Sequence, residues 1–445
     1  MATTQEAAAM AVRPRPGRPG RGPGSSRPGR WLTAGLAVCT VGWGANQFAP
    51  MVLLYRPRLG LSAAVVEGTF GMYAIGLMPG LLVAGRVSDR IGRRPVVMFA
   101  VALSIVAGIV LTLGGHGVGW LFAGRVIMGV ASGCAFSAGS AWIKELSAPP
   151  YEPAGGTNAG AHAGARRASV AMTVGFGVGP LVAGVLAQWA PWPTALPYAP
   201  QLVLAAGALF LVARAPETVA REAVAREAVT RDTTAREALA RDGSATHDGS
   251  GTRPRLGIHG LGERRFRWVV LPLAPWVFGS AAIGMVFVPG LVIDRVTGIA
   301  VFFGALAAVC VSTAGVLVQP LARRLARRDG PHLLVIGMSL VIAGLVIEAG
   351  VAATHQPALA LPAALVLGCG YGFCMVFGLA EVQRMSRPEE LATLTAVFQA
   401  ATYIGFGAPT LLSVLEDYAS PGVLLLAVAG LAAVTLAVTT RRARH

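Results

Sequence analysis

Twelve long apolar stretches, separated by short polar segments, make up most of this 445-residue chain. Each is long enough to cross the roughly 30 Å hydrocarbon core of a bilayer as a helix. The pattern predicts spans at about 31–54, 62–84, 95–115, 118–142, 167–190, 194–213, 268–292, 299–320, 331–352, 357–381, 391–414 and 420–440. We therefore expect an all-α membrane protein with 12 transmembrane helices.

The polar segments divide the chain into five parts. These are a basic N-terminal arm at 1–30, six spans at 31–213, a polar linker at 214–267, six further spans at 268–440 and a basic tail at 441–445. The arm is rich in Arg, Pro, Gly and Ala without periodicity, which is typical of disorder.

The linker contains a five-residue repeat in which an arginine is followed by an acid. Its members are Arg221-Glu222, Arg226-Glu227, Arg231-Asp232, Arg236-Glu237 and Arg241-Asp242. A period of five does not match the helical period of 3.6, so no single apolar stripe forms. We expect a solvated, mobile tether; the alternative is a regulatory or partner-binding segment.

Two pairs of similar segments suggest an internal repeat. Residues 175–180 (GFGVGP) correspond to 405–409 (GFGAP), and residues 85–94 correspond to a degraded copy at 319–328. The two offsets are similar, so the repeat predicts two pseudo-symmetric halves of six helices each.

The distribution of charge indicates orientation. Only 13% of residues are charged, against roughly 25% in soluble domains. All but four of the 37 lysines and arginines fall in segments on one side of the predicted spans; the exceptions are Arg56, Arg58, Arg295 and Arg125. The positive-inside rule then puts both termini in the cytoplasm of a multi-pass cell-membrane protein. Such short clusters between apolar runs argue against nucleic-acid binding.

Several kinds of chemistry are excluded by composition. Lys144, the single lysine, follows Ile143, so the chain has no G-K-[ST] phosphate loop. The five cysteines lie in apolar runs, and the seven histidines are scattered without metal-ligand spacing. We expect no enzyme, no metal site and no cofactor, with an ion gradient as the energy source for any pumping.

The segment Gly85-Arg86-Val87-Ser88-Asp89-Arg90-Ile91-Gly92-Arg93-Arg94 lies between two of the apolar runs. Its G-x-x-x-D-R-x-G-R-R spacing resembles the signature loop of the major facilitator superfamily of secondary transporters. The resemblance covers about 31–440 without the linker. It implies two parallel six-helix halves with a substrate site between them.

The same resemblance implies that the loop latches the two halves in one conformation. The residues given this gating role are Gly85, Asp89, Arg90, Gly92, Arg93 and Arg94, with Glu145 as an acidic partner that completes the network. The alternative is that the arginines only set the topology.

Arg125 is the one cation inside a predicted span. An arginine there costs about 2.5–3.5 kcal/mol on insertion scales, so it should face protein or a water-filled cavity. With Gly129 it matches the superfamily's R-x-x-x-G pattern, which implies a role in proton coupling. The alternative is an arginine that snorkels to the membrane surface.

The fifth span carries Gly175, Gly179, Pro180 and Gly184. Small residues four apart let helices approach closely, and proline removes a backbone hydrogen bond. The pattern resembles the antiporter motif of drug:proton exporters, except that Ala183 replaces one glycine. The alternative is a role in packing alone.

Polar and aromatic side chains within the spans are candidates for the cavity wall. Trp43 and Asn46 share a helical face, and the candidates are Trp43, Asn46, Gln47, Tyr73, Gln399 and Tyr403. Glu67, Glu348 and Glu381 lie near membrane ends, so the sequence does not identify the residue that carries a proton.

These features predict proton-coupled export of a small amphipathic compound, such as a drug or secondary metabolite, by alternating access. The expected partners are the substrate, protons and the lipid bilayer, and we expect a functional monomer. One alternative is a proton-coupled nutrient symporter. Another is a non-transporting membrane sensor or scaffold.

Overall fold

The computed structural model describes residues 29–149, 151–152, 159–219, 262–326, 331–387 and 390–443. All regular structure in these ranges is helical, and within them twelve spans are long and apolar enough to cross a membrane. The expected all-α class and span count are confirmed. Helices are the natural outcome because a chain in lipid must satisfy its backbone hydrogen bonds internally.

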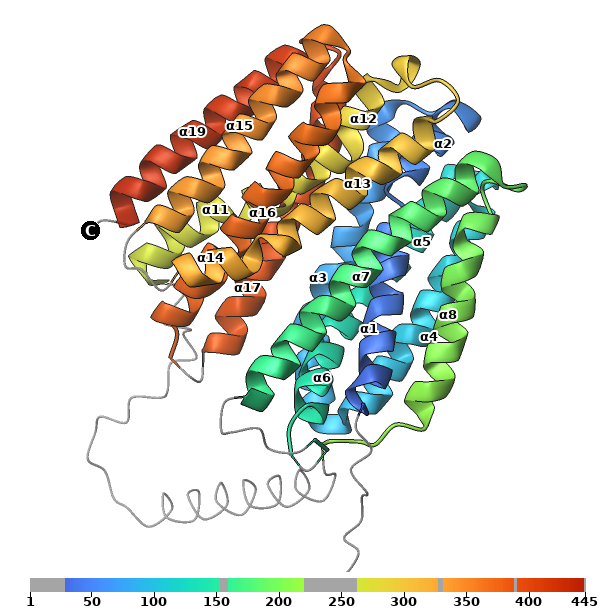
Figure 1. Cartoon of the computed structure of the whole chain (residues 1–445), viewed down its shortest axis with the longest axis vertical. Helices are drawn as coiled ribbons and strands as arrows, with labels where there is room; N and C mark the ends of the chain where they lie inside the picture. The colour runs from blue at the N-terminus through green and yellow to red at the C-terminus, as the bar shows by residue number, and fades with distance from the viewer. Residues whose placement is uncertain are drawn as a thin grey trace, which may run out of the picture.

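The first six spans form one bundle, called here the first half (Figure 1). They are α1 (Trp31–Asn46) with α2 (Met51–Arg58); α3 (Ala63–Ile91); α4 (Arg93–Thr112) with η1 (Leu113–His116); α5 (Val118–Cys134), η2 (Ala135–Gly139) and α6 (Ser140–Leu146); α7 (Ala159–Trp189); and η3 (Leu196–Tyr198) with α8 (Ala199–Ala213).

The last six spans form the second half. They are η4 (Phe266–Val270), α11 (Leu271–Ala282), η5 (Ile283–Phe287) and α12 (Val288–Leu291); α13 (Ala300–Leu317) with α14 (Gln319–Leu325); α15 (His332–Thr354); α16 (Pro357–Met385); α17 (Leu391–Tyr403), η7 (Ile404–Gly407) and α18 (Ala408–Leu415); and α19 (Pro421–Ala443). The short turn η6 (Ile293–Arg295) precedes α13.

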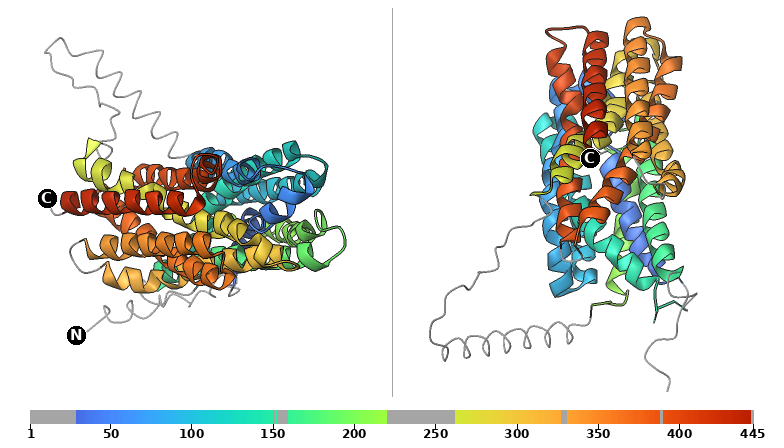
Figure 2. Two further views of the ribbon diagram at one scale, coloured as in Figure 1. Left: turned by 90° about the horizontal axis from the view of Figure 1, so that it is seen from above. Right: turned by 90° about the vertical axis from the view of Figure 1, so that its left-hand side faces the viewer.

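The two halves lie side by side, with their helices running roughly parallel to one another and diagonally in the view of Figure 1 (Figures 1 and 2). Each has its own apolar core, and a third core draws residues from both. The shared core includes Phe48 and Tyr55 from the first half and Val286 and Val301 from the second. It holds the halves together at the end opposite the loop at 85–94. We call these the opposite end and the hairpin end.

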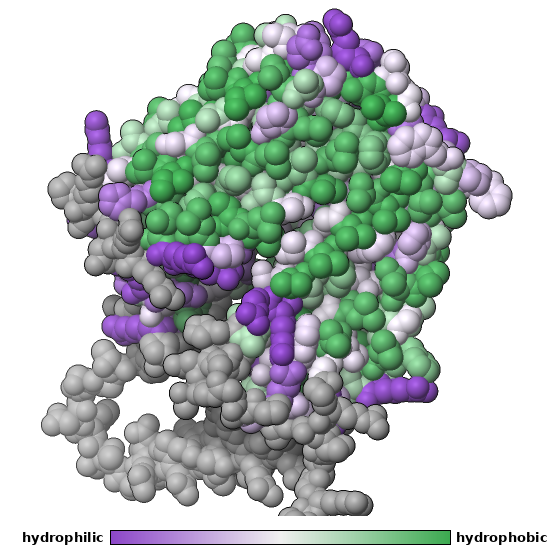
Figure 3. Space-filling model, viewed as in Figure 1, coloured by the Kyte–Doolittle hydropathy of each residue, from purple (hydrophilic) through white to green (hydrophobic). Residues whose placement is uncertain are grey.

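The outer surface of the bundle is apolar, as a lipid-facing surface must be. Large side chains such as Phe99, Phe210, Leu317 and Leu431 are more than half exposed. Figure 3 shows apolar residues across the visible face of both halves, with polar residues gathered toward the two ends. A soluble protein rarely exposes so large an apolar area, which agrees with insertion in a bilayer.

Several predicted span ends differ from the structure by a few residues, and two of the differences affect the description of the fold. The first span does not end near 54, because the helix resumes after a break and α2 ends at Arg58. The charged segment at 85–94, which was expected to lie between the spans as a loop, is mostly helical: α3 continues to Ile91, and α4 begins at Arg93. The break is Gly92 alone, whose φ of +107° is open to glycine but strained for other residues.

Candidate functional site

A cavity of about 860 Å³ lies between the two halves. Its wall runs from Asp89 and Glu145 at the hairpin end to Asn46 and Arg125 deep in the bundle. Side chains from both halves line it, including Gln399 from α17. Volumes of 300–1,000 Å³ are usual for small-molecule sites. The cavity is therefore large enough for an organic compound.

An aromatic cluster forms much of the deep wall. The ring of Phe406 lies 5.2 Å from Phe278 and 5.7 Å from Tyr403, both stacked, and Phe278 stacks on Tyr403 at 4.7 Å. From the first half, Phe70 and Tyr73 meet the edge of Phe406 at 5.3 and 6.0 Å. Tyr73 and Tyr403 were expected on the wall, whereas the phenylalanines were not. The cluster offers flat apolar surface with hydroxyl groups beside it.

Asn46 reaches the wall as expected and connects several helices. Its side-chain amide donates to the carbonyl oxygen of Phe176 on α7 at 2.8 Å and to Ser312 Oγ on α13 at 3.2 Å. Ser312 belongs to the second half and also lines the cavity. Asn46 is thus a polar contact between the halves.

Two other expected wall residues lie elsewhere. Trp43 is 9% exposed and does not line the cavity, because it packs where the glycines of α7 approach α1. Gln47 is fully buried, also off the wall, and neither atom of its amide has a hydrogen-bond partner among the described residues. The helical periodicity indicates that these side chains lie on one face of α1. It does not indicate whether that face packs against another helix or lines the cavity.

Arg125 lies at the inner wall of the cavity and is only 1% exposed. It donates to the carbonyl oxygens of Ala45 at 2.8 Å and Phe70 at 3.3 Å. Its guanidinium lies 4.8 Å from the ring centre of Phe48 and 4.7 Å from that of Tyr73. This is not a snorkelling arrangement, since the charge is held by protein groups. Within the described ranges, no carboxylate pairs with it.

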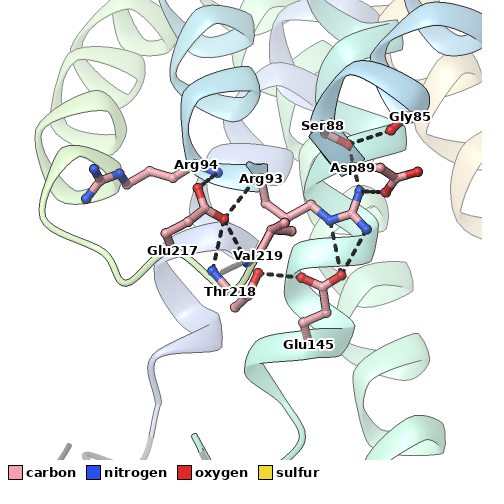
Figure 4. A network of polar contacts seen from close by, with 9 residues as sticks. All are labelled: Gly85, Ser88, Asp89, Arg93, Arg94, Glu145, Glu217, Thr218 and Val219. Atoms are coloured by element: carbon pink, nitrogen blue, oxygen red, sulfur yellow. Dashed lines mark hydrogen bonds and ion pairs between the residues drawn. The ribbon is translucent and has the colours of Figure 1, made fainter. Parts of the chain in front are cut away.

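A network of charges at the hairpin end centres on Arg93 (Figure 4). Arg93 pairs with Asp89 at 2.6 Å and with Glu145 at 3.0 Å, and it donates to Ser88 Oγ at 2.7 Å. Ser88 in turn donates to the carbonyl oxygen of Gly85 at 2.9 Å. The three expected charged residues therefore meet, although the ion pair of the exposed Asp89 contributes only about 0.2–1 kcal/mol. In the part of the chain that is described, these contacts stay within the first half.

The expected residues Arg90 and Arg94 differ in their surroundings. Arg90 is exposed and has no hydrogen bond or ion pair among the described residues. Arg94 donates through Nη1 to the carbonyl oxygen of Ala215, at the start of the linker, at 3.3 Å.

Glu217 is a member of this network that the sequence did not indicate. Its carboxylate accepts the backbone N–H groups of Arg93 at 2.9 Å and Arg94 at 3.0 Å, and thereby caps α4. It also accepts the N–H groups of Thr218 at 2.9 Å and Val219 at 3.1 Å (Figure 4). An anion is favoured there because the first amides of a helix lack partners and carry partial positive charge.

The position of Glu217 depends on Gly92, and it shows that the first residues of the linker pack on the bundle. A Cβ on Gly92 would overlap the Glu217 carboxylate. Thr218 donates its hydroxyl to Glu145, so the linker's first residues join the network instead of leaving the bundle as a tether. The charged repeat at 221–242 lies outside the described residues.

The glycines of α7 are points of close helix approach. A Cβ on Gly175 would overlap the Cys39 carbonyl oxygen, and one on Gly179 would lie 2.7 Å from that of Trp43, both on α1. A Cβ on Gly184 would overlap Ala305 on α13, in the second half. Pro180 lies within the helix between them. The motif residues thus pack α7 against α1 and against the other half.

A sequence profile of the Major Facilitator Superfamily matches residues 32–409. The chain belongs to the major facilitator superfamily. It is therefore a multi-pass membrane protein with the fold of the superfamily's transporters, and not an enzyme.

Curated relatives match only a part of this superfamily member. Multidrug resistance protein MdtL of Escherichia coli (strain K12 / DH10B) is 33% identical over 99 residues, as is that of Shigella boydii serotype 18. The match covers 21% of this chain and 25% of the relative, so the chain spans about a quarter of the relatives' length.

Solved structures share the fold over nearly the whole chain. A POT family transporter in complex with 5-aminolevulinic acid has a TM-score of 0.69 at 11% identity, covering 93% of this chain and 96% of the other. The nucleoside transporter NupG has a TM-score of 0.65 at 12% identity, covering 92% and 97%. A D-xylose-proton symporter has a TM-score of 0.65 at 16% identity, covering 90% and 96%.

Proposed function

We propose that this transporter exports small amphipathic compounds with aromatic rings, in exchange for protons, by alternating access. The observation that carries the proposal is the cavity of about 860 Å³ between the halves, with its aromatic deep wall. Apolar walls with a few placed polar groups suit amphipathic ligands. The partial similarity to MdtL, a multidrug resistance protein, points the same way.

We place the hairpin end in the cytoplasm of a cell-membrane protein, with both termini on that side. The basis is the positive-inside rule, since the clusters at 85–94 and 323–324 and the described linker residues Arg214 and Arg265 flank the spans on the same side. The described conformation is then open to the cytoplasm, because the cavity wall reaches Asp89 and Glu145 while the shared core closes the opposite end.

Alternation would occur by rocking of the two halves, residues 31–213 and 268–440, in a single functional monomer. The hairpin residues Gly85, Asp89, Arg90, Gly92, Arg93 and Arg94 act with Glu145 as the latch that closes the cytoplasmic side. Their contacts within the first half agree with a latch that is released in the open state.

Arg125 is the residue that we assign to proton coupling. Its buried charge lies at the cavity wall, held by backbone carbonyls and rings instead of a carboxylate. An uncompensated cation in low dielectric acts strongly on any charge that enters the cavity. The charge of Arg125 therefore affects the binding of both a proton and a charged substrate in the cavity.

Efflux of fluorescent aromatic dyes, neutral and cationic, from cells that lack their main exporters tests the substrate class. Tyr403→Ala removes a ring of the aromatic cluster, and Tyr418→Ala is the matched control because Tyr418 is 84% exposed and outside the cavity. We expect expression to lower dye retention, Tyr403→Ala to abolish most of this effect and Tyr418→Ala to preserve it. Equal activity of the two variants would contradict the assigned site.

A further inference from the structure

A buried carboxylate joins the two halves at the opposite end of the bundle. Glu67 on α3 is 5% exposed, and its Oε2 accepts a hydrogen bond from Ser413 Oγ on α18 at 2.7 Å. Ser413 is itself only 8% exposed. Glu67 and Ser413 come from different halves, so this contact exists only while the opposite end is closed.

Few groups compensate a negative charge at this position. Within the described ranges Glu67 has no ion pair, and Ser413 is its neutral donor. Burying an ionised carboxylate is costly unless it is paired and fully hydrogen-bonded, whereas a neutral acid needs only ordinary hydrogen bonds. Closing the opposite end around Glu67 is therefore easier when Glu67 carries a proton.

The charged groups around the pair do not remove this cost. Arg56 on α2 attracts a negative charge on Glu67, and Glu416, just after α18, repels it. Partial burial raises the pKa of Glu416, which Arg56 opposes and Asp417 reinforces. On α5, the charged group is Arg125, which donates a hydrogen bond to the carbonyl oxygen of Phe70, about one turn along α3 from Glu67.

We propose that Glu67 is a proton-binding site whose occupied form allows the opposite end to close. The proton comes from water at that end while the halves are apart, and it forms the O–H bond of the Glu67 carboxyl. Closure then covers the neutral acid with Ser413. This inference rests on the proposed alternating access. It identifies Glu67 as the place where the exchanged proton enters the exporter.

Glu348 provides a matched control. It is fully buried on α15, and neither carboxylate oxygen has a hydrogen-bond partner among the described residues. Its neighbour is Gly284 on η5, where a Cβ would lie 3.4 Å from Glu348 Oε1. Glu348 and Gly284 both belong to the second half, so separation of the halves does not expose this carboxyl. A proton on Glu348 should leave the closure of the opposite end unchanged.

The test measures closure directly, without substrate. Spin labels on cysteines placed at Trp192 and Tyr418, 75% and 84% exposed, report the separation of the halves. The five native cysteines are replaced by alanine, and the full chain is held in lipid nanodiscs between pH 5 and 8.5. We expect a short distance at low pH and a longer one at high pH.

The variants decide whether Glu67 causes the change. Glu67→Gln should keep the short distance at every pH, whereas Glu348→Gln and Glu416→Gln should keep the transition. Ser413→Ala, which removes the donor but leaves the carboxyl, should move the midpoint upward by up to about one pH unit.

An unchanged transition in Glu67→Gln, a lost one in Glu348→Gln, or no pH-dependent distance in the parent protein would each overturn the proposal. Because no substrate is present, failure of the dye-efflux test would leave this result intact. Conversely, dye efflux in a protein without the distance change would overturn only the role of Glu67.

Discussion

Removal of the Glu217 carboxylate should loosen the start of α4 and with it the charged network. In Glu217→Ala, the N–H groups of Arg93 and Arg94, now bonded at 2.9 and 3.0 Å, lose their acceptors. Loss of an N-cap costs about 1 kcal/mol, and loss of a charge at a helix N-terminus costs about 0.3–1 kcal/mol. Together these give about 1.3–2 kcal/mol of local stability.

Hydrogen exchange followed by mass spectrometry measures this local effect. A loss of about 1.3–2 kcal/mol corresponds to roughly 8- to 30-fold faster exchange of the amides at the start of α4, at tenfold per 1.4 kcal/mol. Glu217→Gln should give a smaller increase, since one acceptor oxygen is retained without the charge.

The matched control is Glu152→Ala, which removes an ion pair with Arg167 at 2.7 Å but does not touch α4. We expect this variant to leave exchange at the start of α4 unchanged. If Glu217→Ala alters exchange there by less than threefold, or no more than Glu152→Ala does, the capping role is wrong.

Two further substitutions test the packing and the buried charge. Gly175→Ala places a methyl group against the Cys39 carbonyl oxygen and should lower the free energy of unfolding by about 1–3 kcal/mol. Gly207→Ala, where a Cβ would meet open space, should leave it unchanged. Thermal melting of the purified variants compares them, and equal Tm values would refute the close approach. Arg125→Lys replaces a planar guanidinium that donates to two carbonyl oxygens with a single ammonium, so the transport rate should fall at least about tenfold. Arg267→Lys, at an exposed position, should keep the wild-type rate. Equal transport rates for the two variants would exclude a specific role of the guanidinium.

Local sequence signals predicted much of the fold and part of the network. An apolar run of span length is a one-dimensional feature, so twelve spans could be counted without the structure. Asp89 and Arg93 are four residues apart on the chain, and their pairing follows from that local spacing. Glu145 was found because the family resemblance supplied it as a partner.

Contacts distant in sequence were not predictable in the same way. Glu217 lies in a polar linker, and nothing in its neighbours indicates that it caps a helix that begins at Arg93. The stacking of Phe278 on Phe406 depends on how α11 and η7 pack against each other within the second half. Trp43 was assigned to the wall because its helical face was known, but its neighbouring helix was not.

Proton movement in proteoliposomes tests the proposed exchange most directly. Purified protein is reconstituted with an internal pH dye, the vesicles are loaded with acid, and aromatic compounds are added one at a time. Antiport predicts proton release that depends on the compound and is lost in Asp89→Asn and Arg125→Ala. Protons that move in the same direction as the compound, or transport without proton movement by folded and inserted protein, would contradict it.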